Sequence, residues 1–365
     1  MKKIATILGA RPQFIKASVV SEAIVRCGGA LNEVVMHTGQ HFEPNTSDIF
    51  FSELRMPAPT YEFNIHGGGH GEMTGRMLIE IERALVFEVP NAVLVYGDTN
   101  STLAGALAAS KLGIPVAHVE AGLRSFNMTM PEEINRILTD RISRWLFTPT
   151  KAASEQLLRE GIAKTQIVPV GDVMYDVALK YGSRLDLTKG IVGTLGLQPG
   201  QYVLATVHRA ENTNSASRFE TIVSALLKIA EHMTVVWPLH PRVRNLLVSQ
   251  GRMALVSGNL HMIEPVGYLD MVQLEKHAAV IATDSGGVQK EAFFHRVPCV
   301  TIRDETEWVE LVQAGWNRLA PPTSATAVVA AIKDAIGSRG ADIEPYGSGD
   351  TADRIVNTLR NDLRA

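Results

Sequence analysis

The chain has 365 residues, a hydrophobic content of 45% and a net charge of −3 at neutral pH. A chain of this length and composition can bury two hydrophobic cores, which predicts a folded protein of two domains. It has no block of lysines and arginines and no apolar stretch of about 18 residues, so neither a nucleic acid nor a membrane is expected as a partner.

Short apolar runs rich in β-formers alternate with longer helical patterns along the chain. This alternation is typical of parallel sheets that helices cover on both faces. The predicted strands of the first half are residues 4–8, 33–37, 92–96, 116–119 and 145–147. Those of the second half are residues 202–206, 234–237, 260–263, 278–282, 299–302 and 318–319. The predicted fold class is therefore α/β, with two Rossmann-like domains.

The domain boundary is predicted from two breaker-rich segments. Pro169 and Gly171 interrupt a short extended stretch, so we expect a hinge near residues 168–171. A final helical pattern, residues 351–363, follows the glycine-rich segment 345–349. We predict an N-terminal domain of residues 1–168 plus 350–365, to which the last helix returns, and a C-terminal domain of residues 169–349.

The segment from Thr283 to Glu291 is the strongest candidate for an anion site. Ser285, Gly286 and Gly287 stand between a predicted strand and a predicted helix. Unpaired backbone N–H groups and the positive end of the helix dipole would point at one spot there, and glycine lets a phosphate approach the backbone. Glu291 lies one to two turns later, within reach of a ribose diol. A plain strand-to-helix turn is the alternative interpretation of a glycine pair taken alone.

Two further strand ends carry cations. Arg11 and Lys16 follow the first strand at a Gly-Ala-Arg-Pro turn, and they can bind phosphate oxygens as a fork and as a point charge. His208 and Arg209 directly follow the first strand of the second half. This pair can neutralise a diphosphate, and a histidine can also protonate a leaving oxygen near neutral pH. A surface arginine and a cleft-edge histidine without function remain the alternatives.

Carboxylates end the third and fourth strands of the first half. Asp98 and Glu120 occupy these positions, where ligands of parallel sheets bind, and Glu132 and Glu133 begin a helix after Pro131. Several carboxylates in one cleft suit the removal and delivery of a proton at carbon. We therefore predict Asp98 and Glu120 as acid/base candidates and one of Glu132 and Glu133 as the next, because helix-start acids are often only dipole partners.

Metal binding is not expected. His66 and His70 flank a glycine run, but no further ligand has a zinc-like spacing. Cys27 and Cys299 lie far apart and form no metal motif, which favours a reducing, cytoplasmic compartment.

Six motifs in a fixed order carry a family resemblance. They are Gly-Ala-Arg-Pro-Gln-Phe-Ile-Lys at 9–16, Gly-Asp-Thr at 97–99, His-Val-Glu-Ala-Gly-Leu-Arg at 118–124, Pro-Glu-Glu-Ile-Asn-Arg at 131–136, His-Arg-Ala-Glu-Asn at 208–212 and Asp-Ser-Gly-Gly-Val-Gln-Lys-Glu at 284–291. Together they resemble the non-hydrolysing UDP-N-acetylglucosamine 2-epimerases over nearly the whole chain.

The resemblance implies a glycosyltransferase-B-like architecture with the active site in the interdomain cleft, a homodimer, and no metal or cofactor. It also implies the chemistry. The C2 proton leaves, UDP is eliminated to give a 2-acetamidoglucal, and both return with inversion at C2. Carried over by motif, Asp98, Glu120 and Glu132 form the acid/base group with His208. Arg11, Lys16 and Arg209 hold the diphosphate with Ser285, Gly286 and Gly287, and Glu291 holds the ribose.

Several departures from the UDP-N-acetylglucosamine enzymes lie in segments expected to meet the sugar. The loop before Pro131 is shorter, and Trp308 stands where an arginine is common. These features resemble the branch that acts on UDP-2,3-diacetamido-2,3-dideoxyglucuronate in O-antigen synthesis, which we favour over UDP-N-acetylglucosamine. A uronate also needs a cationic partner, for which Arg76, Arg124 and Arg303 are candidates.

Other functional classes remain open. A retaining glycosyltransferase of the same architecture would have a similar UDP site but less use for clustered carboxylates. A hydrolysing epimerase differs only in detail, and a non-catalytic nucleotide-sugar sensor would leave the carboxylates unexplained.

Overall fold

The computed structural model describes residues 1–40, 54, 56–184 and 190–363. Packing divides the chain into two compact units, one of Met1–Val177 with Glu344–Ala365 and the other of Ala178–Ile343. The segment predicted as a hinge, residues 168–171, lies in the first unit, because the strand Ile167–Pro169 pairs with its neighbour Trp145–Thr148.

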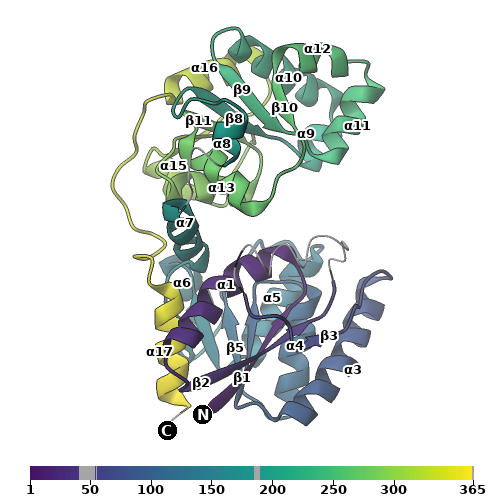
Figure 1. The fold of residues 1–365 in the computed structure, drawn as a ribbon, viewed down its shortest axis with the longest axis vertical. Coiled ribbons are helices and arrows are strands. Elements are labelled where there is room, and N and C mark those ends of the chain that lie inside the picture. Colours follow the sequence, from purple (N-terminus) through teal and green to yellow (C-terminus); the bar gives the residue numbers. More distant parts are fainter. Residues whose placement is uncertain (41–53, 55, 185–189, 364–365) are drawn as a thin grey trace. The chain divides into compact units, whose positions relative to one another are not determined.

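The first unit is built on a seven-stranded sheet in the order β3-β2-β1-β4-β5-β6-β7, and every strand pair is parallel (Figure 1). Its strands are β1 (Lys2–Leu8), β2 (Leu31–His37), β3 (Tyr61–Glu62), β4 (Ala92–Tyr96), β5 (Val116–Val119), β6 (Trp145–Thr148) and β7 (Ile167–Pro169). Its helices are α1 (Arg11–Arg26), α3 (His70–Glu88), α4 (Asn100–Lys111), α5 (Pro131–Ile142), α6 (Lys151–Arg159), the start of α7 (Val173–Arg184) and α17 (Thr351–Asp362), with a 3₁₀ turn at Lys164–Gln166.

The second unit repeats this design with six parallel strands in the order β10-β9-β8-β11-β12-β13. These strands are β8 (Tyr202–Thr206), β9 (Thr234–Pro238), β10 (His261–Ile263), β11 (Val280–Thr283), β12 (Cys299–Thr301) and β13 (Asn317–Leu319). The helices are α8 (Ile191–Thr194), α9 (Ala210–Thr213), α10 (Ala216–Ala230), α11 (Pro241–Ser249), α12 (Met253–Asn259), α13 (Tyr268–His277), α14 (Gly286–Phe294), α15 (Val309–Gln313) and α16 (Ala325–Ala335).

The apolar runs of the strands are buried because successive side chains point to opposite faces and helices cover both. In the second unit Val203 and Ala205 pack in one cluster with α10 and α16. Their neighbours Tyr202 and Leu204 pack in the other cluster, against α13 and α14. The predicted α/β class and the eleven predicted strands are thereby confirmed, with bounds shifted by at most two residues.

The C-terminal helix α17 is part of the first unit. It lies beside α1 (Figure 1), and Arg26 of α1 forms an ion pair of 2.7 Å with Asp353. Ile355, Val356 and Leu359 are buried on its inner face. The short strand β3 was not predicted, because two residues carry too little periodicity to be recognised.

Candidate active site

Each sheet has one point at which the strand order reverses, and ligands of such sheets bind beyond the carboxyl ends of the strands there. The reversal lies between β1 and β4 in the first unit and between β8 and β11 in the second. Most of the predicted site residues follow these four strands, Glu120 and Glu132 follow β5, and Arg303 follows β12. The structure therefore places them at or next to the two positions where an open α/β sheet binds ligands.

Gln13 of α1 joins the ends of β1 and β4. Its Oε1 accepts the backbone N–H groups of Gly9 at 2.8 Å and Ala10 at 3.0 Å, and its Nε2 donates to the carbonyl of Tyr96 at 2.8 Å. The side chain is almost fully buried. It therefore fixes the crevice between the two strands and with it the start of α1, which carries Arg11 and Lys16.

Lys16 reaches from α1 to Glu120 at the end of β5, and the two form a half-buried ion pair. Both groups lie over Gly97, because a Cβ at that position would stand 3.3 Å from Glu120 Oε2 and 3.6 Å from Lys16 Nζ. Gly97 has a φ of +63°, so a side chain there would also be strained. The glycine thus permits the close approach of these two charges to the turn that carries Asp98.

Asp98 is held by Arg136 of α5. The guanidinium donates to Asp98 Oδ2 from Nε at 3.0 Å and from Nη2 at 2.6 Å. The same arginine donates from Nη1 to Glu133 at 2.6 Å. A fork of this kind fixes direction as well as charge. Asp98 and Glu120, which the sequence predicted as neighbours, are each ion-paired in the same unit.

The two glutamates at the start of α5 have different environments. Glu133 is buried and accepts the backbone N–H groups of Ser125 and Phe126, both at 2.9 Å. Burial raises the pKa of Glu133, but these bonds and Arg136 outweigh it and the net pKa is lowered. Glu132 is half-buried, so it is the more accessible carboxylate of the pair.

In the second unit Asp284 organises the loop after β8. This fully buried carboxylate accepts the N–H groups of His208 and Arg209 and the side-chain amide of Asn212, each at about 3.0 Å. The ring of His208 lies 3.3 Å from the same carboxylate and stacks on His240 at 5.8 Å. Burial is the main cause of a lowered pKa of His208, which Asp284 partly offsets.

Helix α14 begins with the Ser-Gly-Gly segment, as predicted. Ser285 is its N-cap, and Oγ of this serine accepts the N–H of Val288 at 3.5 Å. Trp308 donates from Nε1 to the carbonyl of Gly286 at 2.8 Å. The indole therefore holds the backbone from which the first free N–H groups of the helix project.

Glu307 joins two of the predicted cations beside this helix start. Arg303, almost fully buried, donates to it at 2.6 Å, and Arg209 lies 3.5 Å from it. Further along α14, Glu291 lies beside the buried Glu275 of α13. Burial first, and the charge of Glu291 second, raise the pKa of Glu275 well above its ordinary value.

The three arginines considered for a uronate differ in availability. Arg124 is bound to Asp140 at 2.7 Å and to Glu160 at 2.8 Å, so its charge is already balanced. Arg303 is paired with Glu307, as described above. Arg76 is half-exposed and donates to the carbonyls of His66 and Gly67 at 3.0 and 2.8 Å.

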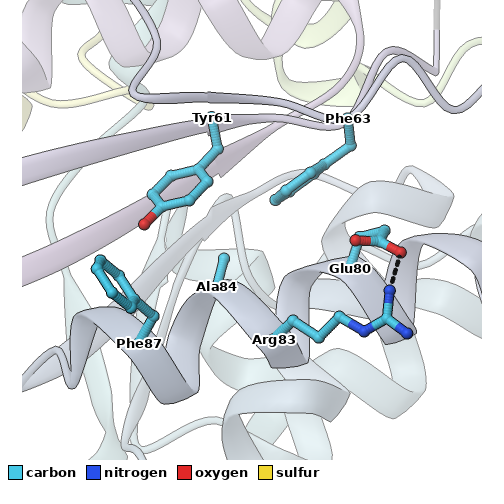
Figure 2. A pocket seen from close by; sticks show the side chains of 6 residues that line it. All are labelled: Tyr61, Phe63, Glu80, Arg83, Ala84 and Phe87. Carbon is cyan, nitrogen blue, oxygen red and sulfur yellow. Dashed lines mark hydrogen bonds and ion pairs between the residues drawn. The ribbon is translucent and has the colours of Figure 1, made fainter.

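A cavity of about 350 Å³ lies elsewhere on the first unit, between β3 and α3. Figure 2 shows the rings of Tyr61, Phe63 and Phe87 around it and the ion pair between Arg83 and Glu80 at its rim. It contains none of the predicted site residues. Among residues 1–40, 54, 56–184 and 190–363 no group of histidine, cysteine and acidic side chains has the geometry of a metal site.

Sequence reasoning missed several of the residues that hold this site: Gln13, Arg136, Asp140, Asp284 and Glu307. Gln13, Arg136 and Asp284 do stand within the quoted motifs, but nothing local to them tells which distant group each binds. His240, which lies between Pro238 and Pro241, caps α11, and its ring stacks on that of His208.

Two Rossmann-like units in one chain, one presenting carboxylates and the other cations with a helix N-terminus, define an enzyme of the glycosyltransferase-B type. A family model described as UDP-N-acetylglucosamine 2-epimerase matches residues 26–360. The chain belongs to this family and is an isomerase. In the described part of the chain no helix has the length and apolar character to cross a membrane.

Several similar proteins match almost the full chain. A UDP-2,3-diacetamido-2,3-dideoxy-D-glucuronate 2-epimerase of Pseudomonas aeruginosa is 52% identical over 98% of this chain and 99% of its own. The solved structure of the Methanocaldococcus jannaschii UDP-GlcNAc 2-epimerase with UDP-GlcNAc and UDP is 43% identical, with a TM-score of 0.84 over 98% and 99% of the two chains. That of the Neisseria meningitidis enzyme bound to UDP-GlcNAc is 31% identical, with a TM-score of 0.86 over 98% and 100%.

Proposed function

We propose that the protein inverts C2 of UDP-2,3-diacetamido-2,3-dideoxyglucuronate without hydrolysis. The observation that carries this proposal is the pair of ion-paired carboxylates, Asp98 and Glu120, at the ends of the neighbouring strands β4 and β5 of the first unit. The preference for the uronate over UDP-N-acetylglucosamine is supported by the 52% identity to the Pseudomonas aeruginosa enzyme and by the departures in sugar-facing loops. UDP-N-acetylglucosamine is the second candidate substrate.

In this proposal a carboxylate of the first unit removes the proton from C2. The electron pair of the C2–H bond forms a C1–C2 double bond, and the C1–O bond breaks with its electrons leaving on UDP. A phosphate oxygen of UDP then adds back to C1, and a carboxyl returns a proton to the other face of C2. Asp98, Glu120 and Glu132 are the acid/base candidates: the first two end the neighbouring strands β4 and β5, and Glu132 begins the helix whose Arg136 binds Asp98.

The second unit binds UDP in this proposal. Because a C2 hydrogen is barely acidic, the reaction needs strong stabilisation of the departing diphosphate. His208 and Arg209 offer charge and hydrogen bonds after β8, and Ser285, Gly286 and Gly287 offer N–H groups at the start of α14. Glu291 holds the ribose, and Arg11 and Lys16 of the first unit contribute further positive charge. Arg303 supports Glu307 beside the phosphates.

The protein is further proposed to act in the cytoplasm, as a homodimer, in the synthesis of a surface-polysaccharide precursor. The resemblance to the diacetamido-uronate branch supports this assignment. A retaining glycosyltransferase is less favoured, because it would leave the clustered carboxylates of the first unit without a purpose.

Incubation with either UDP-sugar in D₂O, followed by NMR and mass spectrometry, tests the function. We expect deuterium at C2, both epimers, and UDP retained in the product. Asp98→Asn and Glu120→Gln should each slow exchange by about 10²- to 10⁴-fold, because a positioned acid or base contributes that much. Glu82→Gln, a change at an exposed carboxylate of α3, is the matched control and should exchange normally.

Each competing function has its own result. Free sugar accumulating together with UDP would indicate a hydrolysing enzyme. No exchange at C2 in the wild-type protein, with either substrate, would refute the epimerase proposal. Normal exchange in both carboxylate variants would remove the assignment of the acid/base group.

A further inference from the structure

His118 is a fully buried histidine with an acceptor at each ring nitrogen. It lies on β5, two residues before Glu120. Nδ1 lies 2.7 Å from Asp140 Oδ1, and Nε2 lies 2.7 Å from the carbonyl oxygen of Gly97. The carbonyl oxygen can only accept, so Nε2 must carry a hydrogen and donate it.

The second nitrogen must also donate, because Asp140 is ionised. Arg124 Nη2 lies 2.7 Å from Asp140 Oδ2, and a buried guanidinium at this distance keeps the carboxyl in its ionised form. Asp140 also accepts the backbone N–H of Gly122 at 3.2 Å, which needs a lone pair on Oδ2. A ring with two donated hydrogens is an imidazolium.

The contacts of this ring span three segments that carry the acid/base candidates. Gly97 is the residue before Asp98 at the end of β4. The strand of His118 itself leads into Glu120, whose φ of +73° is unusual for a residue with a side chain. Asp140 lies on α5, the helix that begins with Glu132 and carries Arg136, the partner of Asp98.

We propose that His118 is a positioning residue of the epimerase reaction, held as a buried imidazolium that ties the ends of β4 and β5 and helix α5 into one fixed arrangement of carboxylates. This proposal rests on the function proposed above. Because the ring has no exposed surface, it acts through its neighbours, and removing it takes a hydrogen-bond partner from the Gly97 carbonyl and from Asp140 together.

The charge state is tested on the wild-type protein, without substrate. In ¹⁵N-labelled protein at pH 7, His118 should show hydrogens on both ring nitrogens, protected from exchange with water. His37 is the internal contrast in the same unit, because burial lowers its pKa to about 4 and it should appear neutral. A neutral His118 ring, with only one N–H, would overturn the proposal.

The positioning role is tested with His118→Asn and His118→Gln, which keep a donor toward Asp140 or toward Gly97. We expect kcat to fall by about 10²-fold, because moving a catalytic carboxylate by about 1 Å reduces the rate by that factor. KM for the UDP-sugar should change by less than about threefold, because uniform binding of the UDP group depends on the second unit. Thr139→Val is the matched control, since it alters a buried, unpaired hydroxyl beside Asp140 and should retain kcat.

Full kcat in both His118 variants would overturn the proposal. So would a loss of kcat that is matched by an equal rise in KM and by the same loss in Thr139→Val, because that pattern indicates general destabilisation. These results are distinct from a failure of the proposed function, which would appear as no C2 exchange in the wild-type protein.

Discussion

At the scale of single residues, two positions of the candidate active site have a strained backbone. Glu120 and Phe126 have φ values of +73° and +58°, a region that residues with side chains seldom adopt. Two backbone N–H groups, those of Glu120 and Ala121, donate to Phe147 and hold the first turn. The carboxylate of Glu133 holds the turn at Phe126, because it accepts the backbone N–H of that residue. Such strain persists only where neighbours impose it, and here it accompanies the carboxylates expected to do the chemistry.

His37 makes the stability of the first unit depend on pH. Burial lowers its pKa to about 4, whereas in the unfolded chain it is 6.5. Between these values the unfolded state binds more protons, so the free energy of unfolding falls as pH falls through this window. The loss amounts to about 3 kcal/mol at most.

His37→Phe should reduce this pH dependence, since the ring packs edge-on against Phe14 at 4.9 Å and needs no proton there. Urea unfolding at pH 7 and pH 4.5 measures the difference. The exposed His232, changed to Phe, serves as control and should leave the wild-type slope. An identical slope in His37→Phe would contradict the prediction.

At the scale of single elements, a substitution in helix α14 can distinguish an effect on UDP binding from an effect on stability. A Cβ added at Gly287 would meet no atom closer than 3.9 Å, so Gly287→Ala fits the structure. Because alanine favours a helix over glycine, the free energy of unfolding should be unchanged or rise by about 0.5–1 kcal/mol. The new methyl group would nevertheless stand where a phosphate is proposed to approach the N–H groups.

UDP affinity of Gly287→Ala should therefore fall by at least about tenfold, or about 1.4 kcal/mol. Calorimetric titration with UDP and thermal unfolding measure the two quantities on the same sample. Gly258→Ala in α12, which also has open space, should retain UDP affinity. Unchanged affinity in Gly287→Ala would argue against the proposed phosphate site.

Assembly is the question at the scale of the whole molecule. Helix α3 exposes three large apolar side chains, and the residue that follows it exposes a fourth: Ile79, Val86, Phe87 and Val89. Beside them lies the apolar cavity of Figure 2, which Phe87 lines. Several large exposed apolar side chains on one helix often mark an interface, and we propose that a second copy of this chain covers them.

Phe87→Glu should therefore convert a dimer into a monomer, because it places a charge in the proposed interface. Light scattering on a sizing column measures the mass. Val248→Glu, at another exposed apolar position on α11 of the second unit, is the control and should leave the dimer intact. A monomeric wild-type protein, or a dimeric Phe87→Glu variant, would rule out this surface.

The sequence alone was sufficient for the repeating β/α pattern and for the strand ends at which functional groups gather. Alternation of apolar residues depends on neighbours in the chain, so β4, β5 and β8 were predicted residue for residue. Glycines and helix starts are equally local signals, so the start of α14 was predicted at the right place, and the anion site there remains a prediction. The six motifs and their order were then sufficient to predict the family, which the family model confirms.

Tertiary structure alone decided which side chains meet. Lys16 was predicted as a phosphate ligand, but its observed partner is Glu120, 104 residues later in the chain. Glu132 and Glu133 are indistinguishable in sequence, and only packing buries the second against the Ser125 loop. The charge of His118 follows from Gly97 and Asp140, which belong to other elements. Local periodicity specifies elements, whereas hydrogen-bond partners depend on contacts that only the folded chain creates.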